Sequence, residues 1–118
     1  MTDGESLKKI ETEMTVLLNM YNVKEVAIED GFVQHNESTK QIQRALGVVL
    51  CVLYEHEPYK YAPSTVKKSI TGNGKANKTD IKNALLKIYP NLKTKNSDER
   101  DSIAIGLHHL KVKYGMSW

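Results

Sequence analysis

The sequence predicts a small α/β domain built from layers of helices and strands. Segments with helical and strand-like patterns alternate along the chain, which is typical of this class. The segment VKEVAIED is rich in valine and isoleucine, as expected of a strand buried on both faces. The 118 residues, 40% of them hydrophobic, suit one domain over 1–118 with a modest core.

The first half of the chain is expected to contain two helices and one strand. Apolar residues recur at helical spacing over 5–21, which predicts an amphipathic helix. The valine-rich segment predicts a strand over 24–30. Ser38 or Thr39 can cap a long helix that runs to about residue 56. Its second half is apolar nearly all round, so we expect it to be buried or to lie at a subunit interface.

The second half is expected to contain one short strand and three helices. YKYA predicts the strand, and Pro63 opens a short helix after it. Asn77 or Thr79 caps the next helix, and Ser97 caps the last one, which runs to about residue 113. Two strands make a poor sheet alone, so part of the sheet is expected to be missing from this sequence.

Charge is distributed unevenly. The net charge is +3, and 60–95 holds nine lysines with one acid, Asp80, whereas the first 37 residues are acidic on balance. A basic middle suits contacts to a phosphate backbone. On charge alone, a solvated lysine-rich face is the more common explanation.

The remaining composition predicts a soluble cytosolic protein. Cys51 lies in the apolar run LGVVLCVLY, so we expect a packed core thiol in a reducing compartment. The first residues have no signal-peptide pattern, and the apolar run 45–54 is too short to span a bilayer, so no membrane association is expected. The Lys and Asn richness fits an AT-rich genome, such as that of a phage.

Two groups of acids are the candidate catalytic residues. Glu29 closes the predicted strand, where ligands of parallel α/β sheets bind. Asp98 and Asp101 are spaced i, i+3 on the first turn of the last helix. Taken alone, that pair is more often simple compensation of the helix dipole. Together with Glu29 it offers hard oxygen ligands for Mg²⁺, and paired Mg²⁺ ions catalyse in-line displacement at phosphodiesters.

Two other motifs are weaker. GNGKANKT does not match the spacing of a phosphate loop, although its glycines can let backbone amides approach a phosphate. His108 and His109 are adjacent and lack cysteines at ligand spacing, so they are poor evidence for zinc.

The sequence resembles the RuvC-type Holliday junction resolvases, a branch of the ribonuclease H-like nucleases. The resemblance runs from about Leu7 to His109 and is carried by four pieces in order: VAIED, STKQIQRALGVVLCVLYE, YAPSTVKKSITGNGKANK and SDERDSIAIGLHHL. P-x-x-V-K followed by G-x-G-x-A-x-K is similar to the family's DNA-contacting segment. D-x-x-D before the apolar helix is similar to its final catalytic motif.

The resemblance implies a ribonuclease H-like fold and a Mg²⁺-dependent homodimer that cuts four-way DNA junctions, with Mn²⁺ as a substitute ion. It implies that Glu29, Asp98 and Asp101 are catalytic and metal-binding acids, and that the helix over 38–54 forms the dimer. The implied DNA-binding residues are Phe32, Lys67, Lys68, Gly72, Gly74, Lys75 and Lys78.

One family feature is not matched. The family begins with a strand carrying G-I-D-P-G, whose aspartate is its first catalytic acid, and no such segment precedes Leu7. A split gene, a truncated reading frame or completion by a second chain would account for this. We therefore expect these 118 residues to bind branched DNA and to cut it poorly. A non-catalytic branched-DNA binding protein is the alternative, and an unrelated interaction domain with chance acids is the third hypothesis.

Overall fold

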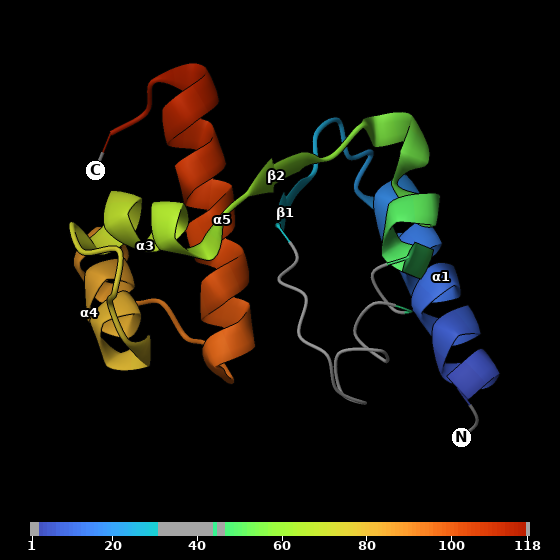
Figure 1. The fold of residues 1–118 in the computed structure, drawn as a ribbon, viewed down its shortest axis with the longest axis horizontal. Coiled ribbons are helices and arrows are strands. Elements are labelled where there is room, and N and C mark those ends of the chain that lie inside the picture. The colour runs from blue at the N-terminus through green and yellow to red at the C-terminus, as the bar shows by residue number, and fades with distance from the viewer. Residues whose placement is uncertain (1–2, 31–43, 45–46, 118) are drawn as a thin grey trace. The chain divides into compact units, whose positions relative to one another are not determined.

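The computed structural model describes residues 3–30, 44 and 47–117, and the chain divides into two compact units (Figure 1). The first unit comprises 1–26 and 31–58, and the second comprises 27–30 and 59–118. No helix in the described part of the chain is both long enough and apolar enough to cross a bilayer.

The first unit contains α1 (Asp3–Met20), which confirms the predicted amphipathic helix. Leu7, Ile10 and Met14 are half-buried, but Leu17, on the same predicted face, is 51% exposed. The helix ends where Asn22 adopts a left-handed conformation with φ 49°. The Val23 N–H then donates to the Leu18 carbonyl at 3.2 Å, which satisfies one of the last carbonyls of the helix.

The long helix predicted from residue 38 lies partly outside the described residues. Residues 47–52 are helical, and the short 3-10 helix η1 (Tyr54–His56) follows a turn at Leu53. The prediction that one helix runs on to residue 56 was therefore wrong. Leu53 is 1% exposed and is therefore a buried residue of this unit. Cys51 is exposed, so the prediction of a packed core thiol was also wrong.

The second unit contains a two-stranded parallel sheet of β1 (Ala27–Glu29) and β2 (Tyr59–Tyr61). Ala27 lies opposite Tyr59, and Glu29 lies opposite Tyr61. The observed strand is shorter than the predicted 24–30, and it is half-buried rather than buried on both faces. The reason is that β2, its partner, is three residues long, and no third strand occurs among the described residues.

Three helices complete the second unit: α3 (Pro63–Thr71), α4 (Lys78–Ile88) and α5 (Ser97–Tyr114). Pro63 opens α3 as predicted, and Asn77 caps α4 in a capping box with Asp80. Asn96, not Ser97, caps α5, because the Asn96 side chain accepts from the Glu99 N–H. The predicted cap was thus wrong by one residue.

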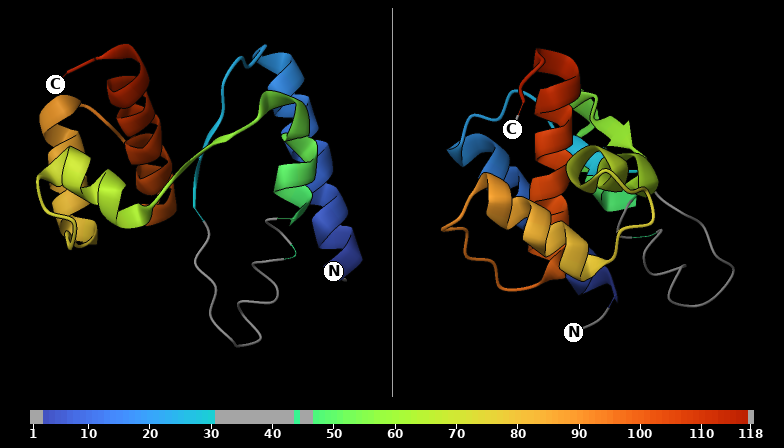
Figure 2. Two further views of the ribbon diagram at one scale, coloured as in Figure 1. Left: turned by 45° about the horizontal axis from the view of Figure 1, so that its top comes forward. Right: turned by 90° about the vertical axis from the view of Figure 1, so that its left-hand side faces the viewer.

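The core of the second unit lies where α3, α4 and α5 pack together (Figure 2). Leu85 on α4 is fully buried, and Ile81 and Leu107 pack beside it. Burial of this kind contributes about 1.5–3 kcal/mol for each large side chain. Half-buried apolar residues extend the cluster: Ile70, Ile88, Leu92 and Ile103.

Candidate metal and nucleic-acid site

The three predicted acids all belong to the second unit and are exposed. Glu29 is the last residue of β1, and Asp98 and Asp101 lie in the first two turns of α5. The strand β1 contacts α5 directly. Both ends of the candidate site are therefore held by elements that pack on each other.

The capping of α5 does not use Asp98 or Asp101. The Asn96 Oδ1 atom accepts from the Glu99 N–H at 3.0 Å, and the Glu99 carboxylate accepts from the Lys95 N–H at 2.7 Å. These two contacts satisfy the N-terminus of the helix. The carboxylates of Asp98 and Asp101 make no hydrogen bond or ion pair with any described residue. Hydrogen-bond capping is thus carried out here by other residues, while the charge of Asp98 still compensates the helix dipole.

The described structure does not gather these acids into one cluster. Within 3–30, 44 and 47–117, no three acidic, histidine or cysteine side chains lie close enough together to hold a metal ion. Glu29 is likewise without an ion pair to any described residue. Carboxylate oxygens are the ligands that Mg²⁺ prefers, so the chemistry of the donors fits. Shared ligation by Glu29, Asp98 and Asp101 stays a prediction.

The predicted DNA-binding lysines are accessible. Lys68, Lys75 and Lys78 are exposed, and Lys67 is half-exposed. None of the four forms an ion pair with a described residue. Their ammonium groups can therefore meet an anion without first breaking a salt bridge.

The loop between α3 and α4 is held by side-chain contacts to its own backbone. Thr71 Oγ1 donates to the Lys67 carbonyl at 2.7 Å and accepts from the Asn73 N–H at 3.1 Å. Asn73 Oδ1 accepts from the Lys75 N–H at 2.9 Å. Gly72 has φ 85°, which a larger side chain rarely adopts. The loop thus presents its lysines from a fixed backbone.

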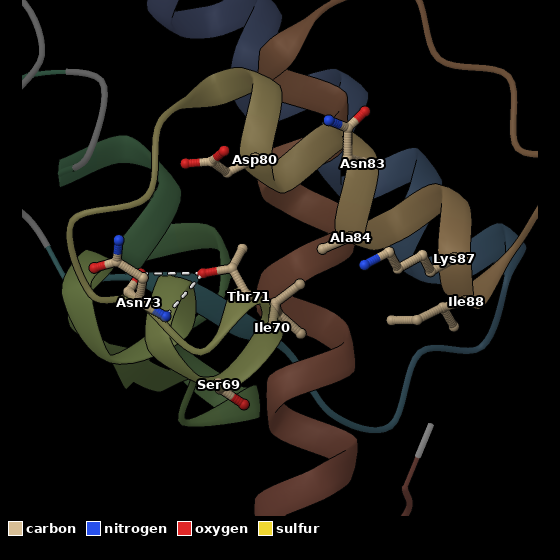
Figure 3. Close-up of a pocket in the computed structure, with 9 residues that line it drawn as sticks. All are labelled: Ser69, Ile70, Thr71, Asn73, Asp80, Asn83, Ala84, Lys87 and Ile88. Carbon is tan, nitrogen blue, oxygen red and sulfur yellow. Dashed lines mark hydrogen bonds between the residues drawn. The ribbon is translucent and has the colours of Figure 1, made fainter.

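An open groove of about 920 Å³ lies beside this loop (Figure 3). It runs between the end of α3 and one side of α4 and is lined mainly by polar groups. Lys87 and Asn83 on α4 were not singled out from the sequence, although Lys87 belongs to the lysine-rich stretch 60–95. The lining residues are Ser69, Ile70, Thr71, Asn73, Asp80, Asn83, Ala84, Lys87 and Ile88.

The two histidines of α5 are buried against β2. His108 is 6% exposed and His109 is 5% exposed. Burial, together with the positive charge of Lys111 and with His109, lowers the pKa of His108 below its ordinary value. The Tyr61 hydroxyl and His109 Nδ1 share a hydrogen bond of 2.6 Å. These histidines therefore belong to a tyrosine–histidine contact between strand and helix.

Two predicted features lie outside the described residues. Phe32 is one of them, and residues 38–43, 45 and 46 of the predicted dimer helix are the other. Of its described residues, 48–50 and Val52 are half-buried.

Tyr61 and His109 were given no role from the sequence. The signal available for them was the paired aromatic pattern of YKY with two histidines on the apolar side of the last helix.

Comparison with known proteins identifies relatives over nearly the whole chain. The family "Crossover junction endodeoxyribonuclease RuvC" matches residues 2–109. The RuvC protein of Ehrlichia chaffeensis is 36% identical over 114 residues, which cover 93% of this chain and 72% of that protein. The RuvC protein of Alkaliphilus metalliredigens is 31% identical over 92% of this chain and 69% of the relative.

Solved structures agree with the sequence comparison. The Thermus thermophilus RuvC structure superposes with a TM-score of 0.79 at 27% identity, covering 98% of this chain and 72% of that one. The same protein in complex with a Holliday junction substrate superposes with a TM-score of 0.83 at 25% identity, covering 98% and 73%. The fold is thus the ribonuclease H-like fold that the sequence predicted, and the chain belongs to the RuvC family of crossover junction endodeoxyribonucleases.

Proposed function

We propose that this protein is a Mg²⁺-dependent nuclease that binds and cuts four-way DNA junctions during recombination and repair. Its family membership supports this activity, as does a RuvC neighbour solved with a Holliday junction substrate. The observation that carries the catalytic assignment is that Asp98 and Asp101 are exposed and unpaired beside a helix cap already satisfied by Asn96 and Glu99. Their oxygen atoms are therefore accessible to a cation, and carboxylate oxygens are ligands that Mg²⁺ prefers.

In this proposal Glu29, Asp98 and Asp101 hold the ion. A bound Mg²⁺ would activate water and stabilise the leaving oxygen at the scissile phosphate. The chain's own contribution is position, since β1 and α5 carry the acids on two packed elements. The exposed N-terminus of α5 also lies near the site, and its partial positive charge favours both carboxylates and phosphate.

The end of α3, the loop after it and the first residue of α4 together supply the proposed DNA contact. Lys67, Lys68, Lys75 and Lys78 would pair with backbone phosphates, and Gly72 with Gly74 would leave room for a close approach. A Cβ added at Gly74 would lie 3.4 Å from the Ser64 carbonyl oxygen, so a side chain there would crowd the loop. Lys87 and Asn83 in the neighbouring groove extend the same surface.

Further parts of the proposal concern organisation. We propose that the two compact units act as one nuclease domain over 1–118, that the protein works as a homodimer through the helix over 38–54, and that it acts in the cytoplasm. The Lys- and Asn-rich composition supports an AT-rich genome, such as that of a phage. Mn²⁺ is the proposed substitute ion.

A labelled four-way junction tests the function. Without metal, the protein should bind the junction more tightly than a linear duplex of the same arm sequences. With Mg²⁺ it should nick the junction. Asp98→Asn should abolish nicking and spare binding. Nicking that survives Asp98→Asn would refute the catalytic assignment, and equal affinity for linear DNA would refute the junction assignment.

A further inference from the structure

A part-buried tyrosine–histidine contact joins the sheet to the last helix. The Tyr61 hydroxyl lies 2.6 Å from His109 Nδ1, and the two atoms share a hydrogen bond whose donor depends on the imidazole tautomer. The Tyr61 ring also meets His108 edge-on, with centroids 4.8 Å apart. Both histidines are buried. A short hydrogen bond in such surroundings fixes the separation of its two elements.

Tyr61 also holds the end of β1 through its backbone. It lies opposite Glu29 in the parallel register, and the Asp30 N–H donates to the Tyr61 carbonyl at 2.8 Å. One residue thus binds the strand end that carries Glu29 and, through its side chain, the helix α5.

The helix geometry relates this contact to the acids. At about 100° per residue, His109 follows Asp98 by eleven residues and lies within about 20° of it around the axis of α5. By the same count, His108 lies within about 20° of Asp101. Along the helix axis, His109 is about 16 Å from Asp98, and His108 is about 10 Å from Asp101. Fixing the histidines against β2 sets which way the acids face.

We infer that Tyr61 and His109 form a positioning pair that sets the distance and orientation of Asp98 and Asp101 relative to Glu29. The inference rests on the proposed metal site formed by those acids. Neither Tyr61 nor His109 contacts the metal, the DNA or the reacting atoms in this scheme. Their hydrogen bond holds α5 against the end of β1, so that the two elements that carry the acids keep one relative position.

The alternative is that Tyr61 is simply a core residue. A Tyr61→Phe substitution distinguishes the two, because it keeps the ring that packs on His108 and removes the hydroxyl. Tyr59→Phe is the matched control on the same strand. The Tyr59 ring also lies beside His109, with centroids 4.6 Å apart, but its hydroxyl accepts from Lys113 Nζ at 2.6 Å.

Amide NMR spectra of the full 118-residue chain without metal test positioning directly. Tyr61→Phe should shift the signals of Glu29 and Asp30 and also those of 98–101, two regions far apart in the sequence. Tyr59→Phe should shift neither region. Shifts confined to the surroundings of Tyr61, or equal shifts in the control, would overturn the inference.

Mn²⁺ affinity, measured by the loss of the free-ion EPR signal on the junction-bound chain, tests the consequence. Tyr61→Phe should weaken Mn²⁺ binding by about threefold to tenfold, the range expected for one lost hydrogen bond. Junction affinity without metal should change by less than about twofold, because Tyr61 does not contact the DNA in this scheme. His109→Asn keeps an acceptor at the Nδ1 position and should lose less affinity than His109→Leu. Equal Mn²⁺ affinity for Tyr61→Phe and Tyr59→Phe would contradict the positioning role.

A separate variant keeps this result distinct from the proposed function. Glu29→Gln should weaken Mn²⁺ binding strongly if the acids hold the ion. Unchanged affinity in Glu29→Gln would refute the metal assignment, and the metal-free spectra would then decide the positioning pair alone: shifts at both acid-bearing segments support it, and shifts at neither overturn it.

Discussion

Replacing Lys67 and Lys78 by alanine should reduce the salt dependence of junction binding by a defined amount. Four lysines in and beside the α3–α4 loop are accessible and unpaired among the described residues, so we assign one phosphate contact to each and refer to the four as the loop lysines. Each contact adds about 0.9 to the log–log slope of affinity against salt concentration. The loop should therefore contribute a slope of about −3.6, and the double variant should lose about 1.8 of it.

These slopes translate into measurable affinities. Over a fourfold rise in salt, from about 50 to about 200 mM, the four contacts should cost the unmodified protein about 150-fold in affinity. The corresponding loss in Lys67→Ala/Lys78→Ala should be about 12-fold. Fluorescence anisotropy with a labelled four-way junction, in EDTA to prevent cleavage, measures both.

The matched control removes two lysines that already have partners. Lys8 and Lys9 on α1 lie 2.8 and 3.9 Å from the carboxylates of Glu11 and Glu13. Lys8→Ala/Lys9→Ala changes the net charge by the same amount as the loop variant. If both double variants lower the slope equally, net charge rather than the loop governs binding, and an unchanged slope in the loop variant would mean that the loop is only a solvated surface.

Three further outcomes are expected. Leu85→Ala should lower the free energy of unfolding by about 2–5 kcal/mol in denaturant titrations, because Leu85 is fully buried. Val112→Ala, on the exposed side of α5, should change it by less than about 0.5 kcal/mol. Equal effects would contradict the assigned core. Burial lowers the pKa of His108 in the folded chain, so the unfolded chain binds more protons below the ordinary value of 6.5. Stability should be complete above that pH and fall as the pH drops below it, and His108→Gln should flatten this part of the profile; an unchanged profile would exclude His108 as its source. Glu29→Gln should abolish Mg²⁺-dependent nicking and spare junction binding, as measured in gel assays. Loss of both nicking and binding, or no change in either, would argue against a purely catalytic role.

The sequence was sufficient to predict the elements that depend on local signals. These are the helix periodicity of 5–21, the proline that opens α3 and the cap of α4, for which Asn77 was one of two candidates; all depend on contacts within a few residues. The order of the four motif segments was sufficient to predict the family and its fold.

Features that depend on distant contacts were not predictable in the same way. The predicted strand 24–30 was longer than the observed β1. The length of β1 is set by its partner β2, which lies about thirty residues away in the sequence. Cys51 is exposed while Leu53, two residues later, is buried. Which of the two is buried depends on how their segment packs, and the apolar sequence around them does not specify this. The Tyr61–His109 hydrogen bond joins residues 48 positions apart, and neither residue type predicts such a contact.

Mn²⁺-induced broadening of amide NMR signals tests the central claim most directly, namely that Glu29, Asp98 and Asp101 hold one ion. The measurement uses the full 118-residue chain bound to a four-way junction, with substoichiometric Mn²⁺. The account predicts that the signals of Glu29 and of 98–101 broaden together, that excess Mg²⁺ restores both, and that Glu29→Gln weakens the broadening at both. Broadening at only one of these segments, or broadening elsewhere that Glu29→Gln does not change, would contradict it.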